Sequence, residues 1–336
     1  MSKRLLVFVP GIVIVAIVII ASATLYKPYV PTTRSGQFTV IGNKIYDPKG
    51  NIFIVKGVTT VYGTFAGGDE SGYGTTNYKN AQRDFDIQKS LGINTVRIFV
   101  SAKDNDSYHK ERLHNVVSWA RQRGFVVEIA NSYSIASANL PWLGYLASTY
   151  NNDPYVWIEP MNEPKCSPPG YLQKCHDWVF WQTEEKEYIR IIRDAGMASP
   201  IVINTVSWSW DLSKIETYPL GDGNIIYGAH RYGNNHATFD ASEQSACDKL
   251  WANLSTTHAI IVDEVGAWDF SGVRNSFAWV QSFIDYTANW VNHRGGAGLI
   301  AFVWYWSSPN TMVNVNGSLN DGGSWFNTHY LQHVKV

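Results

Sequence analysis

The chain has 336 residues and a formal net charge of −1; 45% of its residues are hydrophobic and 16% are charged. This composition excludes a disordered chain, and the length excludes a disulfide miniprotein and allows one large domain or two small ones. The balanced charge attracts no phosphate backbone, so we expect no nucleic-acid partner. Aromatic residues reach 14%; some of these rings belong in a core, and flat ligands such as sugars remain possible for the others.

The first segment in chain order, residues 5–25, carries no charge and is long enough to cross a bilayer. Lys3 and Arg4 precede it, so the positive-inside rule places residues 1–4 in the cytoplasm and the rest of the chain outside. Two interpretations stay open. A retained transmembrane signal anchor fits the length, and a cleaved signal peptide fits the small residues Ala21-Ser22-Ala23. Both predict an extracytoplasmic protein, either membrane-anchored or secreted.

A linker and one large domain follow this segment. Residues 26–37 contain two prolines and read as the linker, so the folded domain is predicted over residues 38–336. Its first part, residues 38–58, alternates between apolar and polar residues around the turn Asp47-Pro48-Lys49-Gly50-Asn51. This pattern predicts a small β-hairpin that leads into the first core strand.

Short apolar runs then recur along the chain, with polar or helical stretches between them. Eight runs are predicted to be strands, at residues 52–57, 95–100, 125–130, 156–161, 200–204, 225–229, 260–263 and 299–304. Helical patterns lie between several of them, at residues 84–91, 111–123, 183–194 and 277–293. Apolar strands that alternate with helices favour parallel pairing and burial on both faces of the sheet.

Eight repeats over about 290 residues fit an α/β fold of the (β/α)8 TIM-barrel type better than a doubly wound sheet. The sequence contains no glycine-rich dinucleotide fingerprint and no phosphate loop to favour the alternative. In such a barrel, functional residues lie at the C-terminal ends of the strands. The ends of the predicted strands are therefore where a site is expected.

Two of these strand ends carry carboxylates. The fourth strand leads into Asn162-Glu163-Pro164, and the seventh continues as Asp263-Glu264-Val265-Gly266. Strands four and seven face each other across the mouth of an eight-stranded barrel, so these carboxylates can flank a bond that lies in the cleft. Hydrolysis of a glycosidic bond needs such a pair. Asp263 and Glu159 lie further inside the barrel and are interpreted as structural neighbours.

Over about residues 40–310, these motifs resemble family 5 of the glycoside hydrolases, the cellulase family. The resemblance implies retaining hydrolysis through a covalent glycosyl-enzyme, with Glu163 as general acid/base and Glu264 as nucleophile. It also implies that Asn162 holds the sugar 2-hydroxyl. The mechanism requires no cofactor and no metal ion, and the expected partner is a β-linked polysaccharide or oligosaccharide of the cellulose or mannan type.

Further positions match the pattern of this family. Arg97 matches the strand-two arginine that pairs with the nucleophile and keeps it ionised. His230 and Tyr232 match the strand-six pair that contacts the substrate and the nucleophile. Trp304 and Trp306 both match the region that supplies the aromatic floor for the attacked sugar, and the sequence does not choose between them.

Strand three departs from the pattern of many members, which carry histidine at its end. Here the strand leads into Asn131, which resembles the endo-β-mannanases of the family. The pattern Glu163-Pro164-Lys165-Cys166, followed by Cys175, is similar to that of the same enzymes. Glucan and mannan therefore stay open as substrates, and so do internal or chain-end attack and the oligomeric state.

The three cysteines suit an oxidising compartment. Cys166 and Cys175 flank a Ser-Pro-Pro-Gly loop that can bring them together as a disulfide, which leaves Cys247 unpaired. Three free, buried thiols are the alternative.

A barrel that binds carbohydrate without catalysis is the rival interpretation of the whole domain. The carboxylate pair, with its arginine and tyrosine support, argues against it, because a pure binder has no use for that set. Trp208 and Trp210 follow the end of strand five and are candidates for flanking sugar subsites.

Overall fold

The computed structural model describes residues 36–60, 74–101, 105–131, 139–164, 176–233, 238–266, 277–305, 311–314 and 316–335. The chain divides into two compact units, Met1–Val30 and Pro31–Val336, and the described residues all belong to the second. The predicted membrane segment at residues 5–25 lies outside the described residues. Within the described part, no helix combines the length and the apolar character that crossing a bilayer requires.

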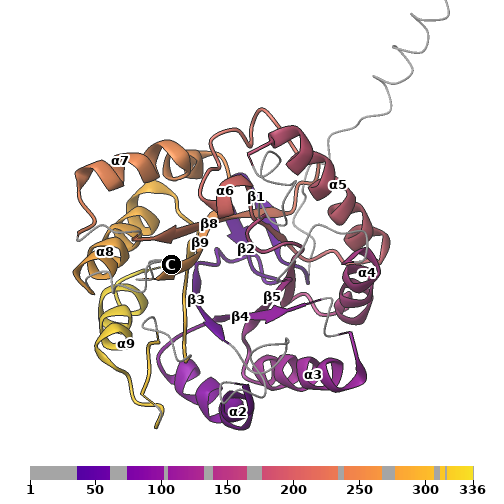
Figure 1. The fold of residues 1–336 in the computed structure, drawn as a ribbon, viewed down its shortest axis with the longest axis horizontal. Helices are drawn as coiled ribbons and strands as arrows, with labels where there is room; N and C mark the ends of the chain where they lie inside the picture. Colours follow the sequence, from indigo (N-terminus) through magenta and orange to yellow (C-terminus); the bar gives the residue numbers. More distant parts are fainter. Residues whose placement is uncertain are drawn as a thin grey trace, which may run out of the picture. The chain divides into compact units, whose positions relative to one another are not determined.

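Eight parallel strands close into a barrel, and helices surround it (Figure 1). The strands are β3 (Val55–Thr60), β4 (Thr95–Val100), β5 (Val126–Asn131), β6 (Val156–Glu159), β7 (Ile201–Ile203), β8 (Ile225–Tyr232), β9 (Ile260–Gly266) and β10 (Gly298–Ala301). Neighbours in the sequence pair with each other, and β10 completes the barrel by pairing with both β9 and β3. The predicted (β/α)8 fold is therefore confirmed.

The strand boundaries agree with the sequence pattern for β4 and shift by a few residues elsewhere. β8 and β9 continue beyond their predicted ends, to Tyr232 and Gly266. β10 instead ends at Ala301, three residues before the predicted end at Trp304. These differences concern the C-terminal ends of the strands, where the chain leaves the regular sheet to build the site.

The predicted helices are present as α2 (Gly74–Ser90), α3 (Ser107–Gln122), α5 (Trp178–Asp194) and α8 (Phe277–Arg294). The outer layer also includes α4 (Asn139–Tyr150), α6 (Val206–Ser209), α7 (Ala241–Leu250), α9 (Asp321–Phe326), η2 (Ala252–Thr256) and η3 (Asn327–Leu331). α3 and α5 begin earlier than predicted because aspartates cap them. The side chain of Asp106 accepts the backbone N–H of His109, and that of Asp177 accepts the N–H of Val179.

The predicted hairpin is present as β1 (Thr39–Ile41) and β2 (Lys44–Tyr46), which pair antiparallel. In the turn after β2, Gly50 has a φ of 86° and donates its N–H to the carbonyl of Asp47 at 2.9 Å. Just before β1, the ring of Phe38 packs edge-to-face on that of Trp157, with centroids 5.2 Å apart. Because Trp157 lies inside the barrel, the hairpin covers the N-terminal end of the barrel.

The barrel interior changes character along its axis. Its N-terminal half, which we call the apolar layer, consists of Val55, Val126, Trp157, Val202, Ile226, Ile261 and Ile300 with Phe38 packed against them. Two positions beyond Val126, Trp157, Val202 and Ile261, the inward side chains are polar and fully buried. These side chains and that of Arg97 on β4 form what we call the charged layer: Arg97, Glu128, Glu159, Asn204 and Asp263. The charged layer therefore separates the apolar layer from the C-terminal end of the barrel.

Candidate active site

Glu163 follows β6 with an unusual backbone conformation. Its φ is 46°, in the left-handed region that costs a non-glycine residue about 1 kcal/mol or more. Bonds from the neighbouring strand ends hold the chain there. Asn162 donates its N–H to the carbonyl of Asn131 at 2.9 Å, and Glu163 donates its N–H to Oδ1 of Asn204 at 3.0 Å. The position of the carboxylate is thus fixed from both sides of β6.

Glu264 lies in β9 beside a β-bulge. Ala229 of β8 pairs with Val262, but the next residue, His230, pairs with Glu264, so Asp263 is an extra residue in β9. Successive residues of a regular strand point to opposite faces, whereas a bulge allows two neighbours to point the same way. Asp263 and Glu264 consequently both contact side chains inside the barrel.

Arg97, fully buried on β4, links most of the site. Its Nη1 donates to Oε2 of Glu264 at 2.8 Å, and its Nη2 donates to Oδ1 of Asn162 at 2.6 Å. Its Nε donates to Glu159 at 2.8 Å and to Glu128 at 3.1 Å. Burial alone would lower the pKa of Arg97, but the charges of Glu159 and Glu264 outweigh it and raise that pKa well above its usual range. Arg97 is therefore a permanent cation beside Glu264.

His230 and Tyr232 reach both rim carboxylates from β8. The hydroxyl of Tyr232 donates to Oε1 of Glu264. Nδ1 of His230 lies 3.0 Å from Oε1 of Glu163 and 3.8 Å from Oε2 of Glu264, and its Nε2 lies 3.3 Å from Oδ1 of Asp263. Burial, and then the charge of Glu264, raises the pKa of Tyr232 well above its usual range, so its hydroxyl stays protonated and can donate.

The two rim carboxylates lie close together. One oxygen of Glu163 and one of Glu264 are within 4.8 Å of each other. Their side chains are 17% and 8% exposed, respectively, whereas the carboxylates of the charged layer are fully buried. The site therefore presents two adjacent carboxylates to the outside and keeps the others beneath them.

The buried carboxylates of the charged layer differ in their protonation. Burial raises the pKa of Glu159 to about 7, although Arg97 lowers it. Burial also raises the pKa of Glu128 well above its usual range, more than Arg97 lowers it. For Asp263, burial acts in the same direction, but His230 and Arg97 outweigh it and lower the pKa. Asp263 is therefore the ionised carboxylate that faces His230.

Two residues predicted to bind substrate have other surroundings. The side chain of Asn131 is buried and donates to the carbonyl of Pro160 at 3.0 Å, so it supports the backbone that leads to Glu163. Trp304 is 1% exposed and packs in the core between the barrel and its helices. A ring in that position is not accessible to a sugar.

Other predicted residues lie outside the described part of the chain. These are Trp306 and the predicted disulfide pair Cys166 and Cys175. Cys247, which that pairing leaves over, is a buried free thiol on α7.

Near the end of β7, Trp208 is 44% exposed, and the guanidinium of Arg231 stacks 3.6 Å from the ring centre of Trp210. Trp210 is half-buried, so Trp208 is the more exposed of the two tryptophans.

Phe302, which directly follows β10, was not predicted from the sequence to lie beside the site. The centre of its ring lies 6.4 Å from that of Tyr232 and 6.3 Å from that of Phe99. Its position in the sequence has the same parity as the two predicted tryptophans, so a regular strand would have placed all three rings on one face. Because β10 ends at Ala301, that alternation stops before Trp304 is reached.

Asn204 was not predicted to belong to the site, and Asp263 was interpreted only as a structural neighbour of the catalytic residues. Nδ2 of Asn204 donates to Oδ2 of Asp263 at 2.7 Å, while its Oδ1 accepts the backbone N–H of Glu163. Their place in the sequence could have indicated this, because a polar residue within an apolar strand must find a polar partner once it is buried. Both residues stand in apolar runs.

Two groups of side chains in the described part of the chain are close enough to share a cation. They are Glu163, His230 and Glu264 in one group, and Glu128, Glu159 and Asp263 in the other. The guanidinium of Arg97 already donates to two members of the second group. In the first, Asp263 and Glu264 outweigh burial and raise the pKa of His230 well above its usual range, which disfavours the neutral imidazole that binds metals.

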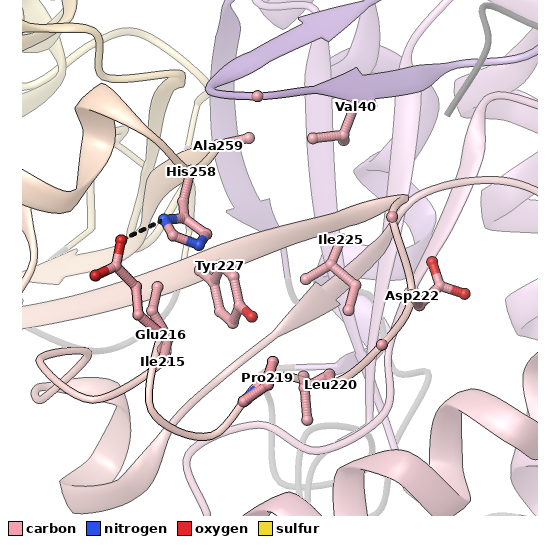
Figure 2. A pocket seen from close by; sticks show the side chains of 13 residues that line it. Val40, Ile215, Glu216, Pro219, Leu220, Asp222, Ile225, Tyr227, His258 and Ala259 are labelled. Atoms are coloured by element: carbon pink, nitrogen blue, oxygen red, sulfur yellow. Dashed lines mark ion pairs between the residues drawn. The ribbon is translucent and has the colours of Figure 1, made fainter. Parts of the chain in front are cut away.

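A hollow with a volume of about 470 Å³ lies at the other end of the barrel (Figure 2). It is lined by residues of β1, residues 215–223 before β8, the start of β8 and the segment before β9, among them Val40, Glu216, Leu220, Ile225, Tyr227 and His258. Nδ1 of His258 lies 3.9 Å from the carboxylate of Glu216. Because these residues lie at the N-terminal ends of the strands, the hollow is separate from the carboxylate site.

The fold and the site together define a class of protein. A closed (β/α)8 barrel with two adjacent carboxylates at facing strand ends, one of them paired with arginine and tyrosine, has the architecture of a glycoside hydrolase. The model of the cellulase family, glycosyl hydrolase family 5, matches residues 46–308. This match covers most of the chain, so the chain belongs to glycosyl hydrolase family 5, as its motifs predicted.

Individual relatives are more distant. An endoglucanase of Clostridium saccharobutylicum is 25% identical over 86% of this chain and 64% of its own length. Endoglucanase N of Pectobacterium atrosepticum is 23% identical over 78% of this chain and 58% of its own length. The chain thus spans about three fifths of these relatives. A β-glucanase of Saccharophagus degradans, solved with cellotetraose, has the same fold, with a TM-score of 0.73 at 18% identity over 93% of this chain and 98% of that one.

Proposed function

We propose that this chain is an endo-β-1,4-glucanase that hydrolyses cellulose-type glucan by double displacement and retains the anomeric configuration. The observation that carries the proposal is the distance between the rim carboxylates, with oxygens of Glu163 and Glu264 within 4.8 Å. Carboxyl groups about 5–5.5 Å apart are typical of retaining glycosidases, whereas inverting enzymes need about 6.5–9.5 Å to admit a water molecule.

Glu264 is the nucleophile in this proposal. Arg97 and Tyr232 donate to its two oxygens, which holds the carboxylate in one orientation. In the first step a carboxylate oxygen of Glu264 bonds to the anomeric carbon while the bond from that carbon to the glycosidic oxygen breaks. In the second step water breaks the new ester and releases the sugar.

Glu163 is the general acid in the first step and the general base in the second. It gives its proton to the glycosidic oxygen as the leaving sugar departs, and it later takes a proton from the attacking water. Its backbone bond to Asn204 and its side-chain contact with His230 support this role, because a proton donor must be held at a fixed distance from the scissile bond.

Asn162 and an aromatic ring complete the proposed subsite for the attacked sugar. Oδ1 of Asn162 accepts from Arg97, which orients the amide so that its NH2 group can donate to the 2-hydroxyl. Of the two tryptophans predicted for the aromatic floor, Trp304 is buried in the core, so we propose Trp306, which lies outside the described residues.

Two observations favour glucan over mannan. Relatives of this chain are named endoglucanases, and a protein of the same fold was solved with cellotetraose. The hint of mannan came partly from Asn131, whose side chain instead supports the carbonyl of Pro160. Mixed glucomannan is the broader substrate that we expect, because amide and hydroxyl groups can bond either epimer.

We also propose that the enzyme acts outside the cytoplasm. The support is the uncharged segment at residues 5–25, which follows Lys3 and Arg4. The segment either stays as an anchor or is removed as a signal peptide. Determining the N-terminal residue of the mature protein by mass spectrometry distinguishes the two.

The direct test combines a substrate panel with stereochemistry. The purified chain is incubated with carboxymethyl cellulose, β-mannan and glucomannan, and the first anomer released from cellopentaose is read by proton NMR. We expect reducing sugar from the two glucose-containing substrates and a β-anomer. No release from any of them, or an α-anomer, would overturn the proposal. Glu163→Gln and Glu264→Gln serve as matched controls, each expected to lose more than about a thousandfold in activity.

A further inference from the structure

A closed ring of polar contacts runs from the backbone of Glu163 back to its own side chain. The N–H of Glu163 donates to Asn204 at 3.0 Å, and Asn204 donates to Oδ2 of Asp263 at 2.7 Å. Oδ1 of Asp263 lies 3.3 Å from Nε2 of His230, and Nδ1 of His230 lies 3.0 Å from Oε1 of Glu163. Three neighbouring side chains thus hold both ends of one catalytic residue.

The barrel is shaped to accommodate this ring. The bulge in β9 turns Asp263 inward beside Glu264, and Gly228 of β8 leaves room for it. A Cβ atom on Gly228 would lie only 2.0 Å from Oδ2 of Asp263 and 2.6 Å from Nδ2 of Asn204. Neither of these short, buried side chains can move away without breaking a bond of the ring. Glycine at this position is therefore a requirement of the Asp263–Asn204 pair.

The charged groups around His230 come from three strands. β6 and its end supply Glu159 and Glu163, β9 supplies Asp263 and Glu264, and β4 supplies Arg97, which is paired with Glu264. Of the carboxylates, Asp263 lies near Nε2, at an ion-pair distance of 3.3 Å, while Nδ1 faces the two rim carboxylates. Because both ring nitrogens face carboxylate oxygens, the imidazole is well placed only when both nitrogens carry protons.

We propose that Asp263, supported by Asn204, is a positioning residue that keeps His230 as an imidazolium and thereby determines which oxygen of Glu163 carries the catalytic proton. The proposal rests on the role of Glu163 as general acid. With a proton on Nδ1, His230 donates to Oε1 of Glu163, so Oε1 is an acceptor and the acidic proton is confined to Oε2.

The chemical consequence concerns the first step of the reaction. The proton leaves Oε2 of Glu163 for the glycosidic oxygen as the bond to the anomeric carbon breaks and the bond to Glu264 forms. If His230 were neutral with a lone pair on Nδ1, it would instead accept the proton of Glu163 from Oε1. The acid would then be turned away from the leaving group, although every catalytic side chain would still be present.

Asp263→Leu tests this role, because it removes the carboxylate that faces Nε2 and leaves no donor in its place that could hold the proton on Nδ1. We expect kcat on cellopentaose to fall about a hundredfold or more near pH 7, the size of a lost general-acid contribution. The alkaline limb of the pH profile should move to lower pH, since His230 loses the carboxylate that favours its charged form. The loss should be below about tenfold on 2,4-dinitrophenyl β-cellobioside, whose leaving group needs no proton.

Asp84→Leu is the matched control, because Asp84 on α2 is also a buried aspartate and is paired with Arg83 outside the barrel. It should leave the pH profile and the ratio of the two substrates unchanged. An Asp263→Leu enzyme that loses the same factor at every pH and on both substrates would reduce Asp263 to a structural residue and overturn the proposal.

A measurement on the unaltered chain covers the case in which Asp263→Leu does not fold or the chain does not cleave glucans. Nitrogen-15 NMR of histidine-labelled protein, with His230→Gln used to assign the signal, reports the protons on both ring nitrogens of His230. We expect an imidazolium at pH 7.5. A neutral ring overturns the inference even if glucan hydrolysis is intact, whereas an imidazolium in a protein without hydrolysis overturns only the proposed function.

Discussion

The two layers of the barrel interior lie two residues apart along the same strands, yet they are specified in different ways. In the apolar layer, residues such as Val126, Trp157 and Ile261 need only fill space, and several combinations of similar volume can do so. In the charged layer, Glu128, Glu159 and Asp263 each require a particular partner, because a buried polar or charged group without one is costly. Side chains can therefore be exchanged more freely in the first layer than in the second.

This difference assigns separate tasks to the two layers. The apolar layer and the hairpin packed on it stabilise the barrel. The charged layer orients the rim carboxylates, and its buried polar groups lower the stability of the barrel. If the division is correct, substitutions in the apolar layer reduce stability without changing the turnover of folded enzyme. Substitutions in the charged layer should change turnover more than their effect on stability explains.

The largest effect is expected for Arg97→Met. The variant leaves Glu159 and Glu264 without their cation and Asn162 without its donor, so activity should fall by more than about a thousandfold. The free energy of unfolding should also drop by about 3–5 kcal/mol, as it does when one partner of a buried ion pair is removed. Steady-state kinetics and urea unfolding measure the two quantities. Activity near that of the wild type would show that the charged layer does not orient Glu264.

Trp157→Ala is the matching substitution in the apolar layer. Removing this fully buried ring, which packs on Phe38, should lower the free energy of unfolding by about 3–5 kcal/mol. The kcat of the remaining folded enzyme should stay within about twofold of the wild type, because Trp157 packs on Phe38 and Phe53 in the apolar layer. A large fall in kcat at full folding, checked by circular dichroism at the assay temperature, would mean that the two layers are not independent.

A smaller effect is expected on the pH dependence of stability. Burial raises the pKa of Glu159 to about 7, so the folded chain keeps a proton there that the unfolded chain has already released above its usual pKa of 4.5. The free energy of unfolding must therefore fall as pH rises between about 4.5 and 7, by up to about 1.4 kcal/mol per pH unit for one proton. Glu159→Gln cannot titrate, so it should flatten this slope in urea unfolding at several pH values. An unchanged slope would assign the titration to another group.

The smallest effect is expected at Trp208, above the charged layer. Its exposed ring is a candidate platform for a sugar outside the attacked subsite, so Trp208→Ala should raise KM for cellohexaose about three- to tenfold and leave kcat on cellotriose unchanged. Ile52→Ala, which removes an exposed apolar side chain beside the hairpin at the opposite end of the barrel, is the control. Equal KM values for Trp208→Ala and the wild type would remove Trp208 from the binding surface.

The two layers were also unequally predictable from the sequence. The apolar layer follows from the period of the strands, and the eight runs identified the barrel and the positions of Glu163 and Glu264 at its C-terminal end. The bulge at Asp263 could not be predicted, because it depends on a local change of register between β8 and β9. Without it, alternation places Asp263 and Glu264 on opposite faces, and the link from Asp263 to His230 is invisible.

The other differences between the predicted and the observed site arise at the ends of the strands. Trp304 was predicted from alternation, but β10 ends at Ala301 and the rule no longer applies beyond it, so Phe302 takes the position beside Tyr232. Asn131 was matched by its place at the end of strand three, but its side chain bonds the carbonyl of Pro160 in the neighbouring segment. Such contacts depend on where two segments meet in space, which a single strand pattern does not encode.

In the proposed mechanism, Glu264 attacks the anomeric carbon of the sugar and forms a covalent intermediate. The most direct measurement is inactivation by 2,4-dinitrophenyl 2-deoxy-2-fluoro-β-cellobioside, which forms the glycosyl-enzyme and slows its breakdown, followed by peptide mass spectrometry. We expect time-dependent loss of activity and one fluorocellobiosyl adduct on the peptide that contains Glu264, with no adduct in Glu264→Gln. A label on another carboxylate, or an enzyme that hydrolyses glucan and is not inactivated, would contradict the account.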